Sequence, residues 1–124
     1  MRPEFGSVEL DHVQLAAPPN CEEAAREFYG GILGFDELSK PEQLAGRGGV
    51  WFRCGTKQVH VGVQEDFVPA TKAHPAFRVG SLEALREHLI SCGVAVAEGE
   101  PMEEMVHLYV QDPFGNRLEF LERR

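Results

Sequence analysis

The chain has 124 residues, 43% of them hydrophobic and 26% charged, which is the composition of a globular protein rather than of a disordered or fibrous one. Its net charge of −8 argues against nucleic acid and anionic membrane surfaces as partners. No apolar run reaches the roughly 20 residues of a membrane-spanning helix, and Met1–Ser7 lacks a secretory signal, so we expect a cytoplasmic protein.

The first half of the chain, about residues 8–65, predicts one helix between a first strand and three further strands. Asn20 stands at the N-cap position of that helix, Glu23 stands at its capping-box position, and Gly30-Gly31 weakens its end. Gly55-Thr56-Lys57 predicts the turn of a hairpin between the last two strands. The four strands are expected at Val8–Ala16, Phe35–Leu38, Val50–Cys54 and Val59–Gln64.

The second half, about residues 73–122, repeats this order. Ser81 caps a helix that runs to about Ser91, and Gly93 is placed to end it in a left-handed turn. Asp112-Pro113-Phe114-Gly115-Asn116 is a dense turn signal before the last strand. We therefore expect a single α+β domain over residues 1–124, built from two β-α-β-β-β modules. The strands of the second module are expected at His74–Val79, Val94–Ala97, Val106–Gln111 and Arg117–Leu121.

Each predicted strand has an apolar face and a polar face, because successive side chains of a strand point to opposite sides. A face that is only solvated usually carries Lys, Glu, Thr and Ser. Here the polar faces hold four of the five histidines, which indicates a polar cavity, although exposed strand histidines can also be incidental. The polar faces carry His12, Gln14, Trp51, Arg53, His60, His74, Arg78, His107, Tyr109, Arg117 and Glu119.

Four of these residues occupy equivalent places in the two modules. His12 and His74 lie in the first strand of each module, and His60 and Glu119 lie in the last strand. A pseudo-twofold axis between the modules would bring the two pairs together. Imidazoles joined by a carboxylate suit Zn²⁺, Fe²⁺, Mn²⁺, Ni²⁺ or Co²⁺, so we expect one divalent transition metal per chain.

Over nearly its whole length the chain resembles the glyoxalase/bleomycin-resistance/dioxygenase family, the vicinal oxygen chelate superfamily. The final motif is the most specific, because Asp-Pro-x-Gly-Asn before a strand whose glutamate binds metal is typical of that family. The resemblance is carried by Leu10-Asp11-His12-Val13-Gln14-Leu15, by Phe28-Tyr29 with Leu33-Gly34-Phe35, by His74-Pro75-Ala76-Phe77-Arg78-Val79, and by the segment from Asp112 to Glu119.

The resemblance implies a cupped, eight-stranded mixed sheet that closes around the metal, commonly in a homodimer. It implies His12, His74 and Glu119 as ligands, with His60 either a fourth ligand or a nearby substrate contact or base. Two adjacent oxygens of a small oxygenated substrate would chelate the metal, which acts as a Lewis acid in a lyase, isomerase or dioxygenase reaction. The alternative is a non-catalytic dimer that sequesters a small molecule or antibiotic, but members of that type lack the metal ligands.

Four other polar-face residues are candidates for substrate binding. Arg53 and Arg78 could anchor a substrate carboxylate, or could be ordinary solvated or salt-bridged arginines. Trp51 could form an apolar wall, or could pack at a dimer interface, and Gln14 is counted with these residues. The candidate catalytic residues are Glu119 and, as general acid or base, Tyr109 and His107.

Overall fold

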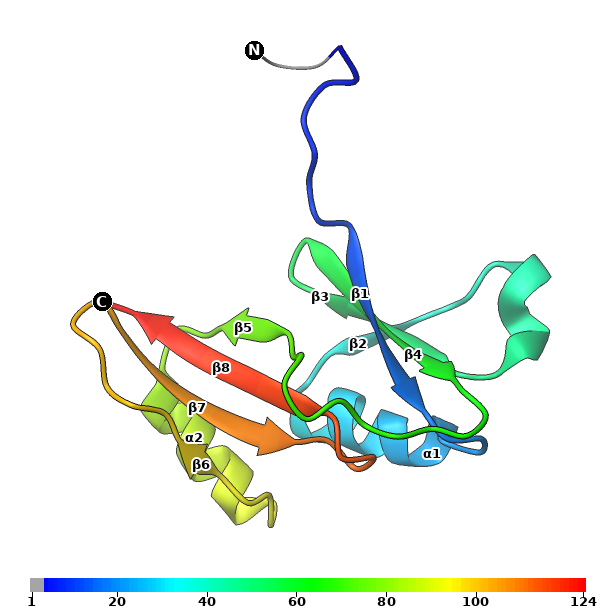
Figure 1. Ribbon diagram of the computed structural model, residues 1–124. Helices are drawn as coiled ribbons and strands as arrows, with labels where there is room; N and C mark the ends of the chain where they lie inside the picture. The colour runs from blue at the N-terminus through cyan, green and yellow to red at the C-terminus, as the bar shows by residue number, and fades with distance from the viewer. Residues whose placement is uncertain (1–3) are drawn as a thin grey trace.

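The computed structural model describes residues 4–124 and contains eight strands in two four-stranded sheets (Figure 1). The strands are β1 (His12–Ala17), β2 (Asp36–Leu38), β3 (Val50–Cys54), β4 (Lys57–Val63), β5 (Ala76–Arg78), β6 (Ala97–Glu98), β7 (Met105–Gln111) and β8 (Arg117–Arg123). The first sheet has the order β1-β4-β3-β2 and the second the order β5-β8-β7-β6. The β1–β4 and β5–β8 pairs are parallel, and the other neighbours are antiparallel.

The α+β class and the repeated β-α-β-β-β order are confirmed. Within the described residues, however, the eight strands form two separate sheets rather than one continuous cupped sheet. The segment Met1–Ser7, in which we expect no secretory signal, begins outside those residues. No helix within residues 4–124 is long and apolar enough to cross a membrane.

The first helical segment differs from expectation at its start. The helical segments are α1 (Glu22–Ala25), the π-helix η1 (Arg26–Ile32), the 3-10 helix η2 (Glu42–Arg47) and α2 (Leu82–Ser91). Asn20 is not the cap of α1: it has a φ of 65°, and Cys21 takes the N-cap position without a side-chain hydrogen bond. Gly30 and Gly31 lie in the last turn of η1, which ends at Ile32, and this agrees with their expected place near the helix end.

The second helix agrees with its signals. The Ser81 hydroxyl accepts a hydrogen bond from the Ala84 amide at 3.1 Å, which satisfies one of the amides that a helix start leaves without a partner. Gly93 follows the helix with a φ of 80°, in the left-handed region that a glycine adopts without steric cost. The boundaries and the cap of α2 are therefore confirmed.

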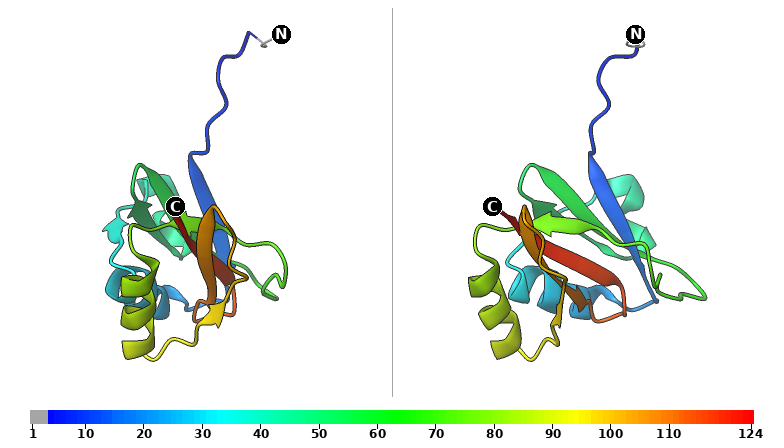
Figure 2. Two further views of the ribbon diagram at one scale, coloured as in Figure 1. Left: turned by 90° about the vertical axis from the view of Figure 1, so that its left-hand side faces the viewer. Right: turned by 60° about the vertical axis from the view of Figure 1, so that its left-hand side comes forward.

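The strand alternation is also confirmed, since the apolar faces bury a common core under the helices. Val59, Val61, Leu108 and Leu118 are at most 2% exposed. Figure 2 shows α2 and the α1–η1 segment on the same side of the second sheet. The opposite faces of the two sheets, here called the inner faces, carry the polar residues singled out above.

The turn between β7 and β8 joins the two sheets. Asp112 is 5% exposed, and its Oδ1 accepts hydrogen bonds from the amides of Phe114 and Asn116, both at 2.9 Å. Its Oδ2 accepts from the Tyr29 hydroxyl of η1 at 2.6 Å and from Asn116 Nδ2 at 2.9 Å. Asn116 Nδ2 also donates to the Ala16 carbonyl of β1 at 2.8 Å. The most specific motif of the sequence therefore ties the two halves of the chain together.

Candidate functional site

The inner face of the first sheet carries a stack of three rings. The imidazoles of His12 and His60 lie 4.2 Å apart between centroids, with an interplanar angle of 18°. The Trp51 indole stacks on His60 at 3.8 Å and 4°. His60 is therefore held between two rings, and it is only 4% exposed.

His12 and His60 each have one ring nitrogen next to an acceptor oxygen. His12 Nδ1 lies 2.8 Å from Asp11 Oδ2, and His60 Nε2 lies 2.8 Å from Gln58 Oε1. An acceptor oxygen holds a proton on the nitrogen that it faces, and the other nitrogen then keeps its lone pair. Burial, followed by the neighbouring His12, lowers the pKa of His60 and favours its neutral form. Neutral imidazoles with one anchored N–H are the usual metal-binding arrangement.

The inner face of the second sheet is organised around Glu119, which is 9% exposed. Its Oε1 lies 3.0 Å from His74 Nε2, and its Oε2 lies 2.8 Å from His107 Nδ1. Burial acts to raise the pKa of Glu119, but the hydrogen bonds to His107 and His74 act the other way, and the pKa is lowered overall. Glu119 is therefore held as a carboxylate between two imidazoles.

His74 and Glu119 fit a divalent metal. Two ligands with bonds of about 2.1 Å, set at roughly a right angle, lie about 3 Å apart, which matches the separation of His74 Nε2 and Glu119 Oε1. His74 Nδ1 donates to the Lys72 carbonyl at 2.8 Å, so its Nε2 is the nitrogen that faces Glu119, and a bound metal would replace the hydrogen bond between Nε2 and Glu119 Oε1.

His107 is placed to support Glu119 rather than to coordinate. Its Nε2 donates to the Glu100 carbonyl at 2.9 Å while its Nδ1 faces Glu119, so both ring nitrogens are engaged. Its side chain is 6% exposed, against 20% for His74. A Cβ on Gly99 would lie 2.5 Å from the His107 ring, so the glycine makes room for it. Both nitrogens of His107 are thus bonded to other residues, while its ring also lines the hollow along β6 and β7 that is described below.

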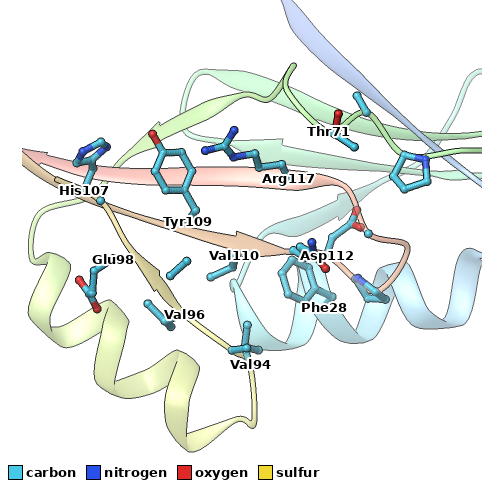
Figure 3. Close-up of a pocket in the computed structure, with 18 of the residues that line it drawn as sticks. Phe28, Thr71, Val94, Val96, Glu98, His107, Tyr109, Val110, Asp112 and Arg117 are labelled. Carbon is cyan, nitrogen blue, oxygen red and sulfur yellow. The ribbon is translucent and has the colours of Figure 1, made fainter.

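Tyr109 contacts both His107 of β7 and His74, which lies two residues before β5 rather than in the expected first strand. Its ring makes edge contacts with His74 at 5.5 Å and with His107 at 5.4 Å, and the Arg117 guanidinium lies 4.2 Å above its ring centroid. Figure 3 shows the Tyr109 hydroxyl and the Arg117 guanidinium directed away from the core side of the sheet. Of the two expected acid–base residues, Tyr109 is the less buried, and its hydroxyl lies on the inner-face side of the strand.

One chain does not bring the four expected ligands together. Within residues 4–124, no group of three or more His, Cys, Asp or Glu side chains is arranged to hold a metal ion. The expected convergence therefore appears as two pairs, one on each sheet, and the sheets are not hydrogen-bonded to each other. The expected substrate residues Arg53, Arg78 and Gln14 are exposed on the inner faces, and Trp51 is half-buried.

Comparison with known proteins assigns this arrangement to a family. The model of the Glyoxalase/Bleomycin resistance protein/Dioxygenase superfamily matches residues 9–120. The chain belongs to this superfamily. No curated protein matches the chain at a significant level.

Solved structures of the superfamily have the same fold. A Bacillus anthracis protein assigned to the glyoxalase family is 46% identical to this chain, with a TM-score of 0.94 and 100% of both chains covered. A glyoxalase/dioxygenase from Nostoc punctiforme is 21% identical, with a TM-score of 0.80, covering 100% of this chain and 97% of that one. A fosfomycin resistance protein from Listeria monocytogenes, complexed with manganese(II), is 16% identical, with a TM-score of 0.79, covering 96% and 95%.

The structure of this glyoxalase-family chain contains two hollows that the sequence did not predict. A hollow of about 1270 Å³ runs along β6 and β7 and has apolar walls at Val94, Val96 and Val110, with Tyr109 and Arg117 on its inner-face side (Figure 3). A smaller hollow of about 260 Å³ lies on the first sheet and includes Lys40 and Arg47. These two residues stand in a connection without periodic pattern, so the sequence carried no signal for them.

Proposed function

We propose that the chain is a metal-dependent enzyme of its superfamily that acts on a small oxygenated substrate. The observation that supports this most directly is the His74–Glu119 pair, with its 3.0 Å separation and the anchored Nδ1 of His74. The donor set of imidazoles and one carboxylate suits Zn, Fe, Mn, Ni or Co. The superfamily neighbour that holds manganese(II) is consistent with this choice, and the identity of the metal is left to the measurement below.

We further propose that a homodimer completes the metal site. Neither sheet of one chain offers three ligands, but a twofold dimer can place His12 and His60 of one subunit against the partner subunit's His74 and the partner subunit's Glu119. Two equivalent sites then form per dimer, with one metal per chain. The apolar residues Phe5, Val8 and Leu10 are at least 62% exposed on an N-terminal segment that stands clear of the sheets (Figure 1), which also favours a covering partner.

The residues of the inner faces then have separate tasks. When bound, the metal supplies Lewis-acid stabilisation of negative charge on two neighbouring substrate oxygens. His107 holds Glu119 in place through its second carboxylate oxygen. The Tyr109 hydroxyl is the group that can give or take a proton, and the Arg117 cation above its ring favours negative charge on that side of the site.

Metal content tests this proposal. Protein purified without chelator is expected to hold about one equivalent of a transition metal per chain by elemental analysis. Glu119→Ala and His74→Ala are expected to lose the metal and stay folded by circular dichroism. His88→Ala is the control, because His88 Nε2 lies on α2 and faces the Ile32 carbonyl at 2.8 Å, away from both pairs. Full metal occupancy in the Glu119 and His74 variants would overturn the assignment.

Mixing two variants tests the dimer. A His12→Ala chain and a Glu119→Ala chain each lack one ligand in every site of their homodimers. If each site lies between subunits, a mixed dimer has one site that lacks both His12 and Glu119 and one site with all its ligands. Random mixing therefore restores about one quarter of the wild-type metal content, whereas sites within one chain would restore nothing.

The alternative function is a dimeric binding protein that sequesters a small molecule or antibiotic. The large hollow along β6 and β7, with its apolar walls, is the observation in its favour. Protein that takes up no transition metal after reloading at neutral pH would support this alternative over the enzyme.

A further inference from the structure

The smaller hollow on the first sheet combines two cations with one indole. It measures about 260 Å³ and lies between the inner face of the sheet and the β2–β3 connection that contains η2. Lys40 and Arg47 line it from the connection, and Gln14 and Trp51 line it from the sheet. No aspartate or glutamate of residues 4–124 is part of its wall. In a chain of net charge −8, this is a local positive region.

Neither cation has a carboxylate partner within 4.0 Å in the part of the chain that the structure describes. Arginines of η1 and α2 form ion pairs with glutamates, but Lys40 and Arg47 form none among residues 4–124. The Lys40 ammonium donates to the Gly48 carbonyl, which uses one of its three N–H groups. The neighbouring Glu22 carboxylate is held by the Gly49 amide at 2.7 Å and does not line the hollow.

The hollow adjoins the ring stack of the first sheet. Trp51 lines the hollow and also stacks on His60 at 3.8 Å, so the same indole belongs to the hollow and to the ring stack. The side chain of Gln14 lies over Gly62, where an added Cβ would come within 2.6 Å of Gln14 Nε2. A ligand held at the two cations would therefore lie beside the ring that stacks on His60.

We propose that Lys40 and Arg47 form an oxyanion subsite that binds a carboxylate, phosphate or phosphonate group of the substrate. The inference rests on the proposed function, because it names the chemical class of the substrate for the same site. An arginine can hold two oxygens of such a group in parallel, and a lysine adds a point charge. Leu44 and Val63 give the hollow an apolar side, so a short apolar or aromatic part next to the oxyanion would fit it.

Trp51 makes the subsite measurable, because it is the one tryptophan of the sequence. The probes are benzoate, phenylphosphonate and the uncharged benzamide, added to the full-length protein while tryptophan emission is recorded. Benzoate or phenylphosphonate is expected to give a saturable change, and the stronger of the two identifies the type of oxyanion. Benzamide is expected to bind at least about tenfold more weakly, because it lacks the charge. Equal binding of all three, or no saturable change with either anion, would overturn the subsite.

Three variants locate the binding. Arg47→Gln and Lys40→Met remove the positive charge, keep an unbranched side chain, and are each expected to weaken anion binding by about tenfold. Lys57→Met is the matched control, because Lys57 lies on β4 of the same sheet but does not line the hollow. Circular dichroism checks that each variant is folded. If Lys57→Met weakens binding and the other two do not, or if no variant weakens it, the assignment to Lys40 and Arg47 is wrong.

The titration is carried out on chelator-treated protein and again on metal-loaded protein. The protein could bind anions through Arg47 and yet take up no metal. That result would support the subsite and reject the metal-dependent enzyme. Metal uptake without anion binding would support the metal-dependent enzyme and reject the subsite. The two proposals can therefore fail separately.

Discussion

Replacing Tyr29 with phenylalanine removes one hydroxyl from the contact between the two halves of the chain. The Tyr29 side chain is 0% exposed, and its hydroxyl donates to Asp112 Oδ2 at 2.6 Å. A hydrogen bond to a charged group contributes about 1.5–3 kcal/mol. The Asp112 carboxylate keeps its hydrogen bonds from the Phe114 and Asn116 amides and from Asn116 Nδ2, so it is not left without donors. We therefore expect Tyr29→Phe to lower the free energy of unfolding by about 2 kcal/mol.

Urea denaturation at one protein concentration measures this loss, and the midpoint of thermal unfolding is expected to fall by about 8 °C. Tyr109→Phe is the matched control, because the Tyr109 hydroxyl points to the inner face (Figure 3), and its stability is expected to stay within about 0.5 kcal/mol of wild type. A Tyr29→Phe protein as stable as wild type would show that the buried hydroxyl does not help to join the sheets.

The same residue predicts an alkaline limit. Burial, and next the negative charge of Asp112, raise the pKa of Tyr29 far above its ordinary value. In the unfolded chain the hydroxyl ionises near pH ~10. Because the folded pKa is the higher one, the contribution of Tyr29 is complete below about pH 10 and is lost as the pH rises further. The stability difference between wild type and Tyr29→Phe should shrink by about 1.4 kcal/mol per pH unit there; a constant difference in urea titrations up to pH ~11 would refute this.

The remaining predictions concern the inner faces and α2. His107→Ala should weaken metal binding by about 10- to 100-fold in a competition titration and keep the fold, since it removes the support of Glu119; unchanged affinity would show that His107 plays no part. Gly62→Ala should leave the urea midpoint unchanged, because the flexible Gln14 side chain can move, but should weaken benzoate binding at the neighbouring hollow. Ser81→Ala should cost about 1 kcal/mol of unfolding free energy through loss of the helix cap, with metal content unchanged.

Local patterns in the sequence were sufficient for the strands and their faces. The valines of β4 alternate with His60, and the leucines of β7 and β8 alternate with Tyr109 and Glu119, so the buried and inner faces followed from the two-residue period of a strand. The Ser81 cap and the Gly93 turn were likewise local signals, and both are present in the structure. The prediction that Asn20 caps the first helix was wrong. Asparagine also adopts the left-handed conformation, and the sequence does not distinguish that use from a helix cap.

The sequence by itself determined the family, the two repeated modules and the side of each sheet on which the candidate ligands lie, because these depend on neighbours close in the chain. Only the tertiary structure showed that the His12–His60 and His74–Glu119 pairs stand on separate sheets, and that both nitrogens of His107 are engaged. It alone placed Lys40 and Arg47 beside Trp51. Such relations join residues far apart in the chain, and their distances depend on how the sheets and the irregular β2–β3 connection pack, for which a single sequence has no periodic signal.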